Sequence, residues 1–192
     1  MTERTQISAG IGGSLALEFA NTAGWHLSPE PVERLQDWRD VVRWAAEQRL
    51  VEADQTDALA QLKVALEPVN ALREAIFRIG VARARHEHPA AADLDLVIAR
   101  ASGPLPAGTW SGEALRWRFD ASEVQSLLLG LIARDAVALF ASERAARLRL
   151  CAGEHCGWLF LDESRGKPRR WCSMSDCGNR SKARRAYARR KE

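Results

Sequence analysis

The sequence lacks any long run of apolar residues. Its longest, Leu127 to Ala133, is stopped by Arg134 and Asp135, far short of the roughly 20 residues that span a bilayer. Residues 1–6 are polar and include no apolar segment of the kind that directs secretion. We therefore expect a cytoplasmic protein with no membrane partner.

Residue patterns for catalysis are also missing. The chain has no Gly-rich phosphate loop, no paired carboxylate signature and no Ser/His/Asp constellation. Its four histidines, His26, His86, His88 and His155, are scattered, and His86 and His88 fit a solvated helix end better than a set of metal ligands. The sequence therefore predicts a protein that is not an enzyme.

Cysteine is absent from the first 150 residues. The four cysteines form two C-x4-C pairs, Cys151 with Cys156 and Cys172 with Cys177, separated by fifteen residues. Each pair can present two thiolates from one tight turn, and the spacer is long enough for a hairpin that folds one pair onto the other. Four such ligands suit one structural, tetrahedral Zn²⁺ with no open position for chemistry.

Two disulfides are the competing interpretation of the four cysteines. Nothing directs the chain to an oxidising compartment, so reduced thiols that bind metal are favoured. His155 lies next to Cys156 and is an alternative ligand to it, although two thiolates from each pair is the simpler closure. About forty residues bury too little surface to fold alone, so the metal would supply the missing stability, on the order of 10 kcal/mol in such modules.

Charge is distributed unevenly along the chain. Residues 151–192 hold 11 Lys and Arg against 5 Asp and Glu, a net charge of +6, whereas residues 1–150 hold 17 against 20, a net charge of −3. A Zn²⁺ ion with four thiolates contributes −2 to the tail, which reduces the contrast without reversing it. A neutral-to-acidic body thus precedes a basic tail.

Many of the tail's cations gather on an expected helix that starts at Asn179 and contains no Pro, Gly or carboxylate up to Lys191. Small residues between long cations suit a helix that lies close to a groove and reaches phosphates on both sides. The predicted nucleic-acid contacts, two of them on the preceding segment, are Arg169, Arg170, Arg180, Lys182, Arg184, Arg185, Arg189, Arg190 and Lys191. The alternatives are a solvated charged end and a patch for an acidic protein.

The same residues carry a family resemblance. The segment from Cys151 to the tetrapeptide Cys177-Gly178-Asn179-Arg180 resembles the CGNR zinc finger, which is named for that tetrapeptide. Upstream, Gly13 to Thr22 and the Trp-containing helix that follows are similar to the start of the ABATE domain, which precedes this finger in bacterial proteins described as stress-induced transcription regulators. The resemblance implies a regulator that binds DNA through its finger.

The expected fold is mainly α (α+β). A helical, ABATE-like domain with a small β element occupies residues 1–147, and a treble-clef-like or ribbon-like CGNR finger occupies residues 148–192. No linker rich in Gly or Ser separates them, so we expect the finger to dock on the last helix of the body.

Hydrophobic periodicity and breaker residues place the individual elements. Helices are expected over residues 32–48, 54–86 with a break or kink at Pro68, 90–101, 122–147 and from 179 onward. Strands are expected over residues 15–19, over 115–119 with one buried face and a hairpin partner at 109–110, and as finger arms at 158–161 and 169–171.

Glu18, Asn21 and Trp25 are candidates for a small-molecule pocket in the N-terminal segment. The alternative, which the residue types favour, is that Asn21 satisfies the backbone of a turn and Trp25 packs against the body.

The sequence thus predicts a DNA-binding, nucleoid-associated transcription regulator. Its body is a candidate sensor of a small-molecule effector and a candidate homodimerisation unit, because one module of this size buries only about 600–1,000 Å² on DNA and specificity would need a second copy. The alternatives are an RNA- or ribosome-associated zinc protein and a protein-interaction adaptor.

Overall fold

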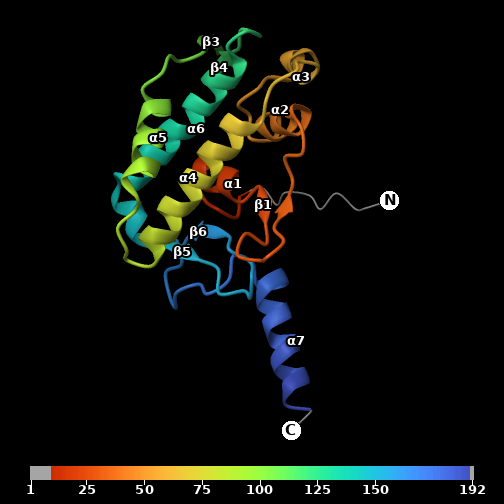
Figure 1. Cartoon of the computed structure of the whole chain (residues 1–192), viewed down its shortest axis with the longest axis vertical. Coiled ribbons are helices and arrows are strands. Elements are labelled where there is room, and N and C mark those ends of the chain that lie inside the picture. Colours follow the sequence, from red (N-terminus) through yellow and green to blue (C-terminus); the bar gives the residue numbers. More distant parts are fainter. Residues whose placement is uncertain (1–9, 191–192) are drawn as a thin grey trace.

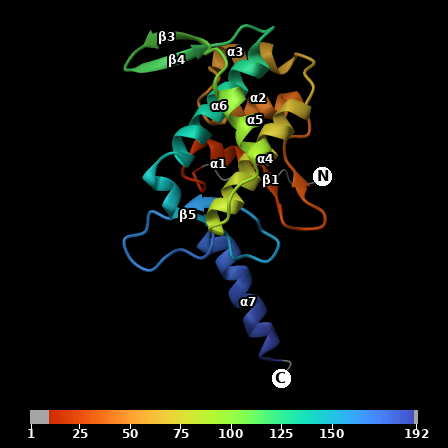
Figure 2. The same ribbon diagram turned by 60° about the vertical axis from the view of Figure 1, so that its left-hand side comes forward.

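The computed structural model describes residues 10–190 as a helical body from which the last helix projects (Figure 1). The body contains α1 (Leu15–Ala20), α2 (Trp38–Glu47), α3 (Ala53–Ala60), α4 (Glu67–Ala84), α5 (Ala91–Ala101), α6 (Val124–Phe140) and the 3-10 turn η1 (Glu143–Arg147). The π-helical turn η2 (Met174–Gly178) leads into α7 (Asn179–Ala188), which stands clear of the body in two views (Figures 1 and 2).

Antiparallel two-stranded sheets supply the β structure of the described residues. They pair β1 (Ala23–Gly24) with β2 (Val32–Glu33), β3 (Ala107–Ser111) with β4 (Ala114–Arg118), and β5 (Leu148–Leu150) with β6 (Leu159–Leu161). The predicted mainly α class with a small β element is confirmed. No described helix combines the length and the apolar character that crossing a membrane requires.

The hydrophobic core lies where α1, α4 and α6 meet. Helix α1 is buried from Ala16 to Ala20, and the ring of Phe19 lies 5.3 Å from the ring of Trp44 on α2. Ile76 on α4 and Leu128 on α6 are fully buried in the same cluster. The short α1 is therefore the element around which the longer helices pack.

The finger shares this core with the body. Leu148 of β5 and Leu159 and Leu161 of β6 are at most 3% exposed and belong to the body's hydrophobic cluster. Helix α4 approaches β6 so closely that a Cβ atom on Gly80 would lie 2.4 Å from Leu159 Cδ1. The finger is thus joined to the body through the packed hairpin β5–β6.

The prediction of a strand over residues 15–19 is wrong, because these residues form α1. Ser14 caps the helix, accepting a hydrogen bond at its Oγ from Leu17 N at 3.3 Å. Residues 16–20 are all buried, so the alternation of larger and smaller side chains does not mark one exposed face. Alternation predicts a strand only where one face meets water.

The helix predicted over residues 32–48 begins later than expected. Val32 and Glu33 pair with β1, and α2 starts at Trp38. Asp37 caps it by accepting a hydrogen bond from Asp40 N at 3.0 Å. The helix therefore begins at its own cap, after the start that the sequence predicted at residue 32.

Two longer helical predictions are each divided in the structure. The break in the tract 54–86 is confirmed, since α3 ends at Ala60 and Pro68 lies in the first turn of α4, where its missing N–H removes no helical bond. The helix predicted over 122–147 ends at Phe140, and η1 follows it. The helix predicted over 90–101 is confirmed as α5.

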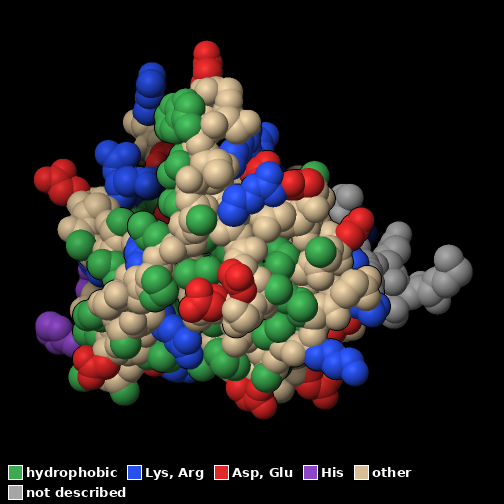
Figure 3. Space-filling model, turned by 90° about the horizontal axis from the view of Figure 1, so that it is seen from above, with side chains coloured by type: hydrophobic (Ala, Val, Ile, Leu, Met, Phe, Trp, Pro, Cys, Tyr) green, Lys and Arg blue, Asp and Glu red, His purple; other side chains and the backbone are tan. Residues whose placement is uncertain are grey.

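The hairpin β3–β4 is confirmed, but its expected buried face is incomplete. Trp117 is partly buried and Phe119 is buried, whereas Leu115 is 48% exposed opposite the exposed Trp110. This hairpin lies at the end of the molecule away from α7 (Figure 1). Seen from that end, hydrophobic side chains and charges of both signs are interspersed (Figure 3).

The two finger arms do not pair with each other as predicted. Strand β6 covers most of residues 158–161 but pairs with β5, and residues 169–171 form no strand. This segment is held instead through Arg170 O, which accepts a hydrogen bond from Ala152 N at 2.9 Å. The helix predicted from Asn179 is confirmed as α7.

Replacing Gly80 with Ala tests the contact between α4 and β6. The added methyl group would overlap Leu159, which is fully buried, so we expect the free energy of unfolding to fall by about 1–3 kcal/mol despite the better helix propensity of Ala. Gly130→Ala is the matched control in α6, because its Cβ would meet the tip of the partly exposed Arg134 side chain at 3.2 Å. Urea unfolding of both variants measures the difference, and equal stability would contradict the close approach.

Candidate functional site

Four sulfur atoms converge between the finger's two turns. The Sγ atoms of Cys151, Cys156, Cys172 and Cys177 lie within 4.8 Å of one another, and all four side chains are buried. Cys172 Sγ lies 3.8 Å from Cys156 Sγ and 3.7 Å from Cys177 Sγ. A tetrahedron with Zn–S bonds of about 2.3 Å has edges of about 3.8 Å, so the cluster fits the predicted structural Zn²⁺.

The alternatives to this ligand set do not fit the geometry. All four cysteines are unpaired, and their sulfur atoms lie too far apart for disulfide bonds of about 2.05 Å. The side chain of His155 is 54% exposed, and its Nε2 lies 3.8 Å from Glu154 Oε1. Cys156, not His155, therefore completes the cluster.

Backbone geometry fixes the turn that carries the first two ligands. Gly153 N and Cys172 N donate to Cys151 Sγ at 3.4 and 3.3 Å, and such donors stabilise a thiolate. The turn also requires left-handed backbone at His155, with φ 60°, and at Gly157, with φ 72°. An added Cβ on Gly157 would lie 2.8 Å from His26 Cβ, so a larger residue would push the turn away from the body.

The crowded thiols do not ionise independently. Hydrogen bonds from Cys156 and then from Cys172 hold the pKa of Cys151 far below its usual value. The hydrogen bonds to Cys151 raise the pKa of Cys156 and of Cys172. Zn²⁺ binds thiolates, so it must displace the protons that the thiols carry when it binds.

The loop between β1 and β2 holds the first zinc turn against the body. His26 N donates to Cys156 O at 3.1 Å, and Leu27 N donates to His155 O at 3.3 Å. The His26 ring stacks on Phe77 with ring centroids 3.6 Å apart, and its Nε2 lies 2.8 Å from an oxygen of Glu74. The β1–β2 loop thus holds the carbonyl groups of His155 and Cys156 in place. The contacts of His26 in turn hold this loop on α4.

Glu74 is held as an anion beneath this loop. Its burial would raise the pKa of the carboxyl group, but the hydrogen bond and charge of His26, together with the charge and hydrogen bond of Arg73, lower that pKa below its usual value. Arg73 also binds Glu33 on β2 through two hydrogen bonds of 2.7 and 2.5 Å. The chain of charged groups links α4 to both ends of the loop.

Asn21 fastens β6 directly to the body. Its Nδ2 donates to Leu159 O at 2.8 Å, and its Oδ1 accepts from Leu159 N at 2.9 Å, both bonds being buried. Glu18 accepts from Gly12 N at 2.6 Å, while Gly12 O accepts from Leu161 N at 2.9 Å. Burial raises the pKa of Glu18, although hydrogen bonds from backbone amides oppose the rise.

The structure gives Glu18, Asn21 and Trp25 separate surroundings. Glu18 and Asn21 are buried and use their side chains on backbone groups of the protein. Trp25 instead lines a hollow of about 160 Å³ beside the zinc turn, together with Gly153, Glu154, Trp171, Arg180 and Arg184, and neither Glu18 nor Asn21 lines it. Asn21 does satisfy backbone groups, as the alternative expected, but those groups belong to β6.

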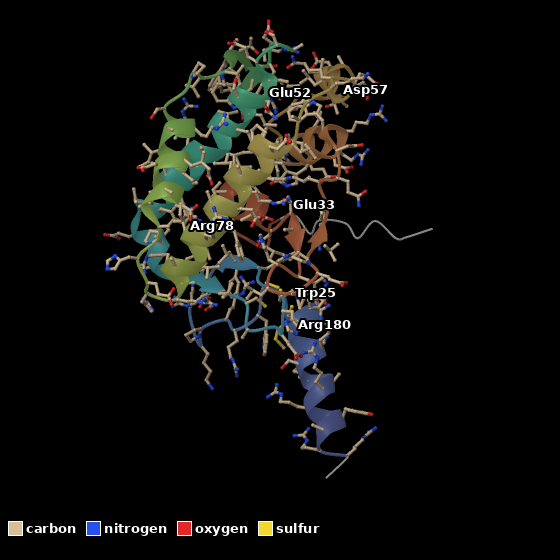
Figure 4. All side chains as sticks on the ribbon, in the orientation of Figure 1. Trp25, Glu33, Glu52, Asp57, Arg78 and Arg180 are labelled. Atoms are coloured by element: carbon tan, nitrogen blue, oxygen red, sulfur yellow. The ribbon has the colours of Figure 1, made fainter. Side chains whose placement is uncertain are left out.

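Arg180 joins the start of α7 to both the zinc cluster and the body. Its guanidinium carbon lies 4.5 Å from the centre of the Trp25 ring, and its Nη2 donates to Cys177 Sγ at 3.1 Å. Its Nη1 lies 2.7 Å from Asp176 Oδ1. Figure 4 shows Trp25 and Arg180 side by side where α7 leaves the body. Trp25 has φ 52°, which is uncommon for a bulky residue, so this ring position is maintained against backbone strain.

The other predicted nucleic-acid contacts fall into two groups. Beyond Arg180, α7 and the turn after it carry five exposed cations within the described residues: Lys182, Arg184, Arg185, Arg189 and Arg190. Arg184 forms an ion pair with Glu154, and Arg185 Nε donates to Ser181 O at 3.4 Å. Lys191 lies outside the described residues.

The second group, Arg169 and Arg170, lies on the segment before Cys172. Arg169 stacks over Phe160 at 4.6 Å and donates from Nη2 to Cys172 O at 2.7 Å. Arg170 stacks over Trp171 at 5.3 Å. Both residues are exposed but are used in part to brace the zinc site.

Sequence reasoning missed Arg34, which follows β2 directly. Its guanidinium lies 4.9 Å from the centre of the Trp158 ring, and its Nε and Nη1 are buried without a hydrogen-bond partner. A lone Arg after a two-residue strand has no local pattern that separates it from a surface cation. Only the folded position of the finger reveals it.

Two family models match the chain. The model of the ABATE family, described as "Putative stress-induced transcription regulator", matches residues 13–143. The model of the CGNR zinc finger matches residues 147–190, which include all four cysteines. No curated protein matches the chain.

We expect the purified protein to contain one Zn²⁺ per chain, measured by elemental mass spectrometry. Cys156→Ser should lose the metal and expose residues 151–190 to proteolysis, because the remaining three sulfur ligands cannot close the site. His155→Ala is the control and should keep one Zn²⁺ and wild-type protection. Zinc loss in the His155 variant, or retention in the Cys156 variant, would show that the ligand set is wrong.

Proposed function

Because the chain belongs to the ABATE family and carries a CGNR zinc finger, we propose that it is a transcription regulator that binds DNA through α7 and the adjoining finger residues. The zinc ion would act as a structural element rather than as a catalyst, since four protein ligands leave no open position on the metal. A DNA-binding regulator of this kind would work in the cytoplasm, on the nucleoid, and we propose no enzymatic activity for it.

One observation carries the proposal. Helix α7 projects from the body with its root fixed at the zinc cluster, and residues 179–190 contain six cations and no carboxylate (Figures 1 and 2). Ten helical residues extend about 15 Å, and a helix of this kind fits the major groove, which is about 12 Å wide. A projecting basic helix with a rigid root suits a polyanion that surrounds it on two sides.

The helical spacing separates the cations into two flanks. Lys182, Arg185 and Arg189 follow one flank at intervals of three and four residues, and all three are exposed. Arg180 and Arg184 lie on the other flank, where they already bind Asp176 and Glu154. The first flank is therefore the better candidate for contacts with backbone phosphates.

The body would supply what a single short helix lacks. One module of this size covers only about 600–1,000 Å² of DNA, so sequence-specific binding favours two copies that act together. The body is also the candidate receptor for an effector, because its β1–β2 loop touches both the zinc turn and Arg180.

Binding to a DNA duplex should weaken steeply with salt. Four to six phosphate contacts predict a log–log slope of roughly −4 to −6, from about 0.9 per phosphate. Fluorescence anisotropy of a labelled duplex at several salt concentrations measures the slope. A flat response would reject the electrostatic contact, and stronger binding to RNA of the same length would assign the helix to RNA.

A triple variant tests the exposed flank of α7. Lys182→Ala, Arg185→Ala and Arg189→Ala together should reduce the magnitude of the salt slope by about 2–3 and weaken binding at low salt. The matched control is the triple variant Arg39→Ala, Arg49→Ala and Lys63→Ala. It also removes three positive charges, but from exposed positions of the body. Equal losses in the two variants would mean that net charge, and not α7, governs binding.

A further inference from the structure

We propose that Arg34 from the body and Arg180 from α7 are the counter-charges of the zinc–tetrathiolate centre, so that zinc binding holds the finger against the body. The inference concerns the metal centre and does not depend on whether α7 binds nucleic acid. It assigns a role to two arginines that lie outside the ligand set.

The charge of the centre calls for such partners. One Zn²⁺ with four thiolates carries a net charge of −2, and the four sulfur atoms are buried. A buried charge is costly unless opposite charges or hydrogen bonds compensate it. Asp176, in the turn between Cys172 and Cys177, adds a further negative charge nearby.

Arg180 meets one side of the cluster directly. Its Nη2 lies 3.1 Å from Cys177 Sγ, a contact that a thiolate strengthens because the sulfur then accepts a charge-assisted hydrogen bond. Trp25 supports the guanidinium from the body side at 4.5 Å. The position of Arg180 is thus set jointly by α7, the metal ligand and the body.

Arg34 lies on the ring of Trp158, which packs against the cysteine cluster. Its guanidinium is packed between Trp158, at 4.9 Å, and Gly24, where an added Cβ would lie 3.3 Å from Nη2. Burial lowers the pKa of Arg34, while negative charge on Cys156 and Asp176 acts in the opposite direction. The Nε and Nη1 atoms of Arg34 are buried without a hydrogen-bond partner, so the negative charge of the zinc–thiolate centre would compensate a burial that is otherwise unfavourable.

Arg34 links zinc binding to docking of the finger because it belongs to the body and not to the finger. Zinc binds thiolates, so the centre gains its net charge of −2 only when the ion is bound and the thiol protons have left. Without the ion, less negative charge lies near Arg34 to compensate the burial of its guanidinium. With zinc bound, the centre carries a net charge of −2, and Arg34 compensates part of that charge only when the body and the finger are docked. Because binding free energies are reciprocal, zinc strengthens the docking of the finger and docking strengthens zinc binding.

The rate of zinc release tests whether Arg34 acts as a counter-charge of the zinc centre. Arg34→Met, which keeps much of the side-chain bulk and removes the charge, should speed zinc transfer to a chromogenic chelator by about 10- to 100-fold, the range typical of groups that support metal ligands. Arg34→Lys should restore most of the slow release. Arg39→Met, at an exposed position of the body, is the control and should leave the rate unchanged. A wild-type rate in Arg34→Met, or no rescue by Lys, would overturn the role of charge.

The Co²⁺-substituted protein gives a second readout that packing alone would not produce. Removing a positive charge beside the sulfur atoms raises the energy of their electrons, so the sulfur-to-cobalt charge-transfer band should move to longer wavelength in Arg34→Met and in Arg180→Met. Arg180→Met keeps this test available if Arg34→Met fails to fold. An unshifted band in the folded variants would contradict the assignment.

Hydrogen exchange measures the coupling to docking. In the wild-type protein, removal of zinc by a chelator should increase exchange at the amides of His26, Leu27 and Leu159, which bridge body and finger. Amides in the middle of α4 and α6 are the internal control and should stay protected. Equal protection of the three bridging amides with and without zinc would show that docking does not depend on the metal.

Discussion

Four sulfur atoms within 4.8 Å of one another are the constraint on which the functional end of this protein depends. They come from two turns, the second of which leads into α7, so a single ion ties both turns to each other and to the start of the helix. Each segment also has its own attachment: the first turn to the β1–β2 loop, the second to Arg169, and the helix to Arg180 and Trp25. The metal therefore orders contacts that belong partly to the finger and partly to the body.

The division into body and finger is clear in sequence but not in packing. Family models meet between residues 143 and 147, yet the side chains of β5 and β6 complete the hydrophobic core built on α1 and α4. Asn21 adds two buried hydrogen bonds across the same boundary. A finger attached in this way loses apolar burial when it moves away from the body, so packing as well as hydrogen bonding fixes its position.

The zinc site and α7 could be predicted from sequence because their signals are local: paired cysteines at short spacing and a segment free of Pro, Gly and carboxylates. Residues 15–19 misled the same approach, because every side chain after Leu15 is buried and periodicity no longer reports an exposed face. Arg34, Asn21 and Trp25 depend on contacts with residues more than 120 positions away, which no local pattern contains.

Helix α7 projects from the body like a lever arm, and Arg180 beside Trp25 and Arg184 beside Glu154 anchor it (Figure 1). Over a length of about 15 Å, a rotation of roughly 10° at the root moves the far end by about 2.6 Å. That displacement approaches the 3.4 Å rise between successive base pairs along one strand of DNA. A small adjustment of the loop at Trp25 would therefore be amplified into a displacement of the far end of α7 that is close to the spacing of stacked bases.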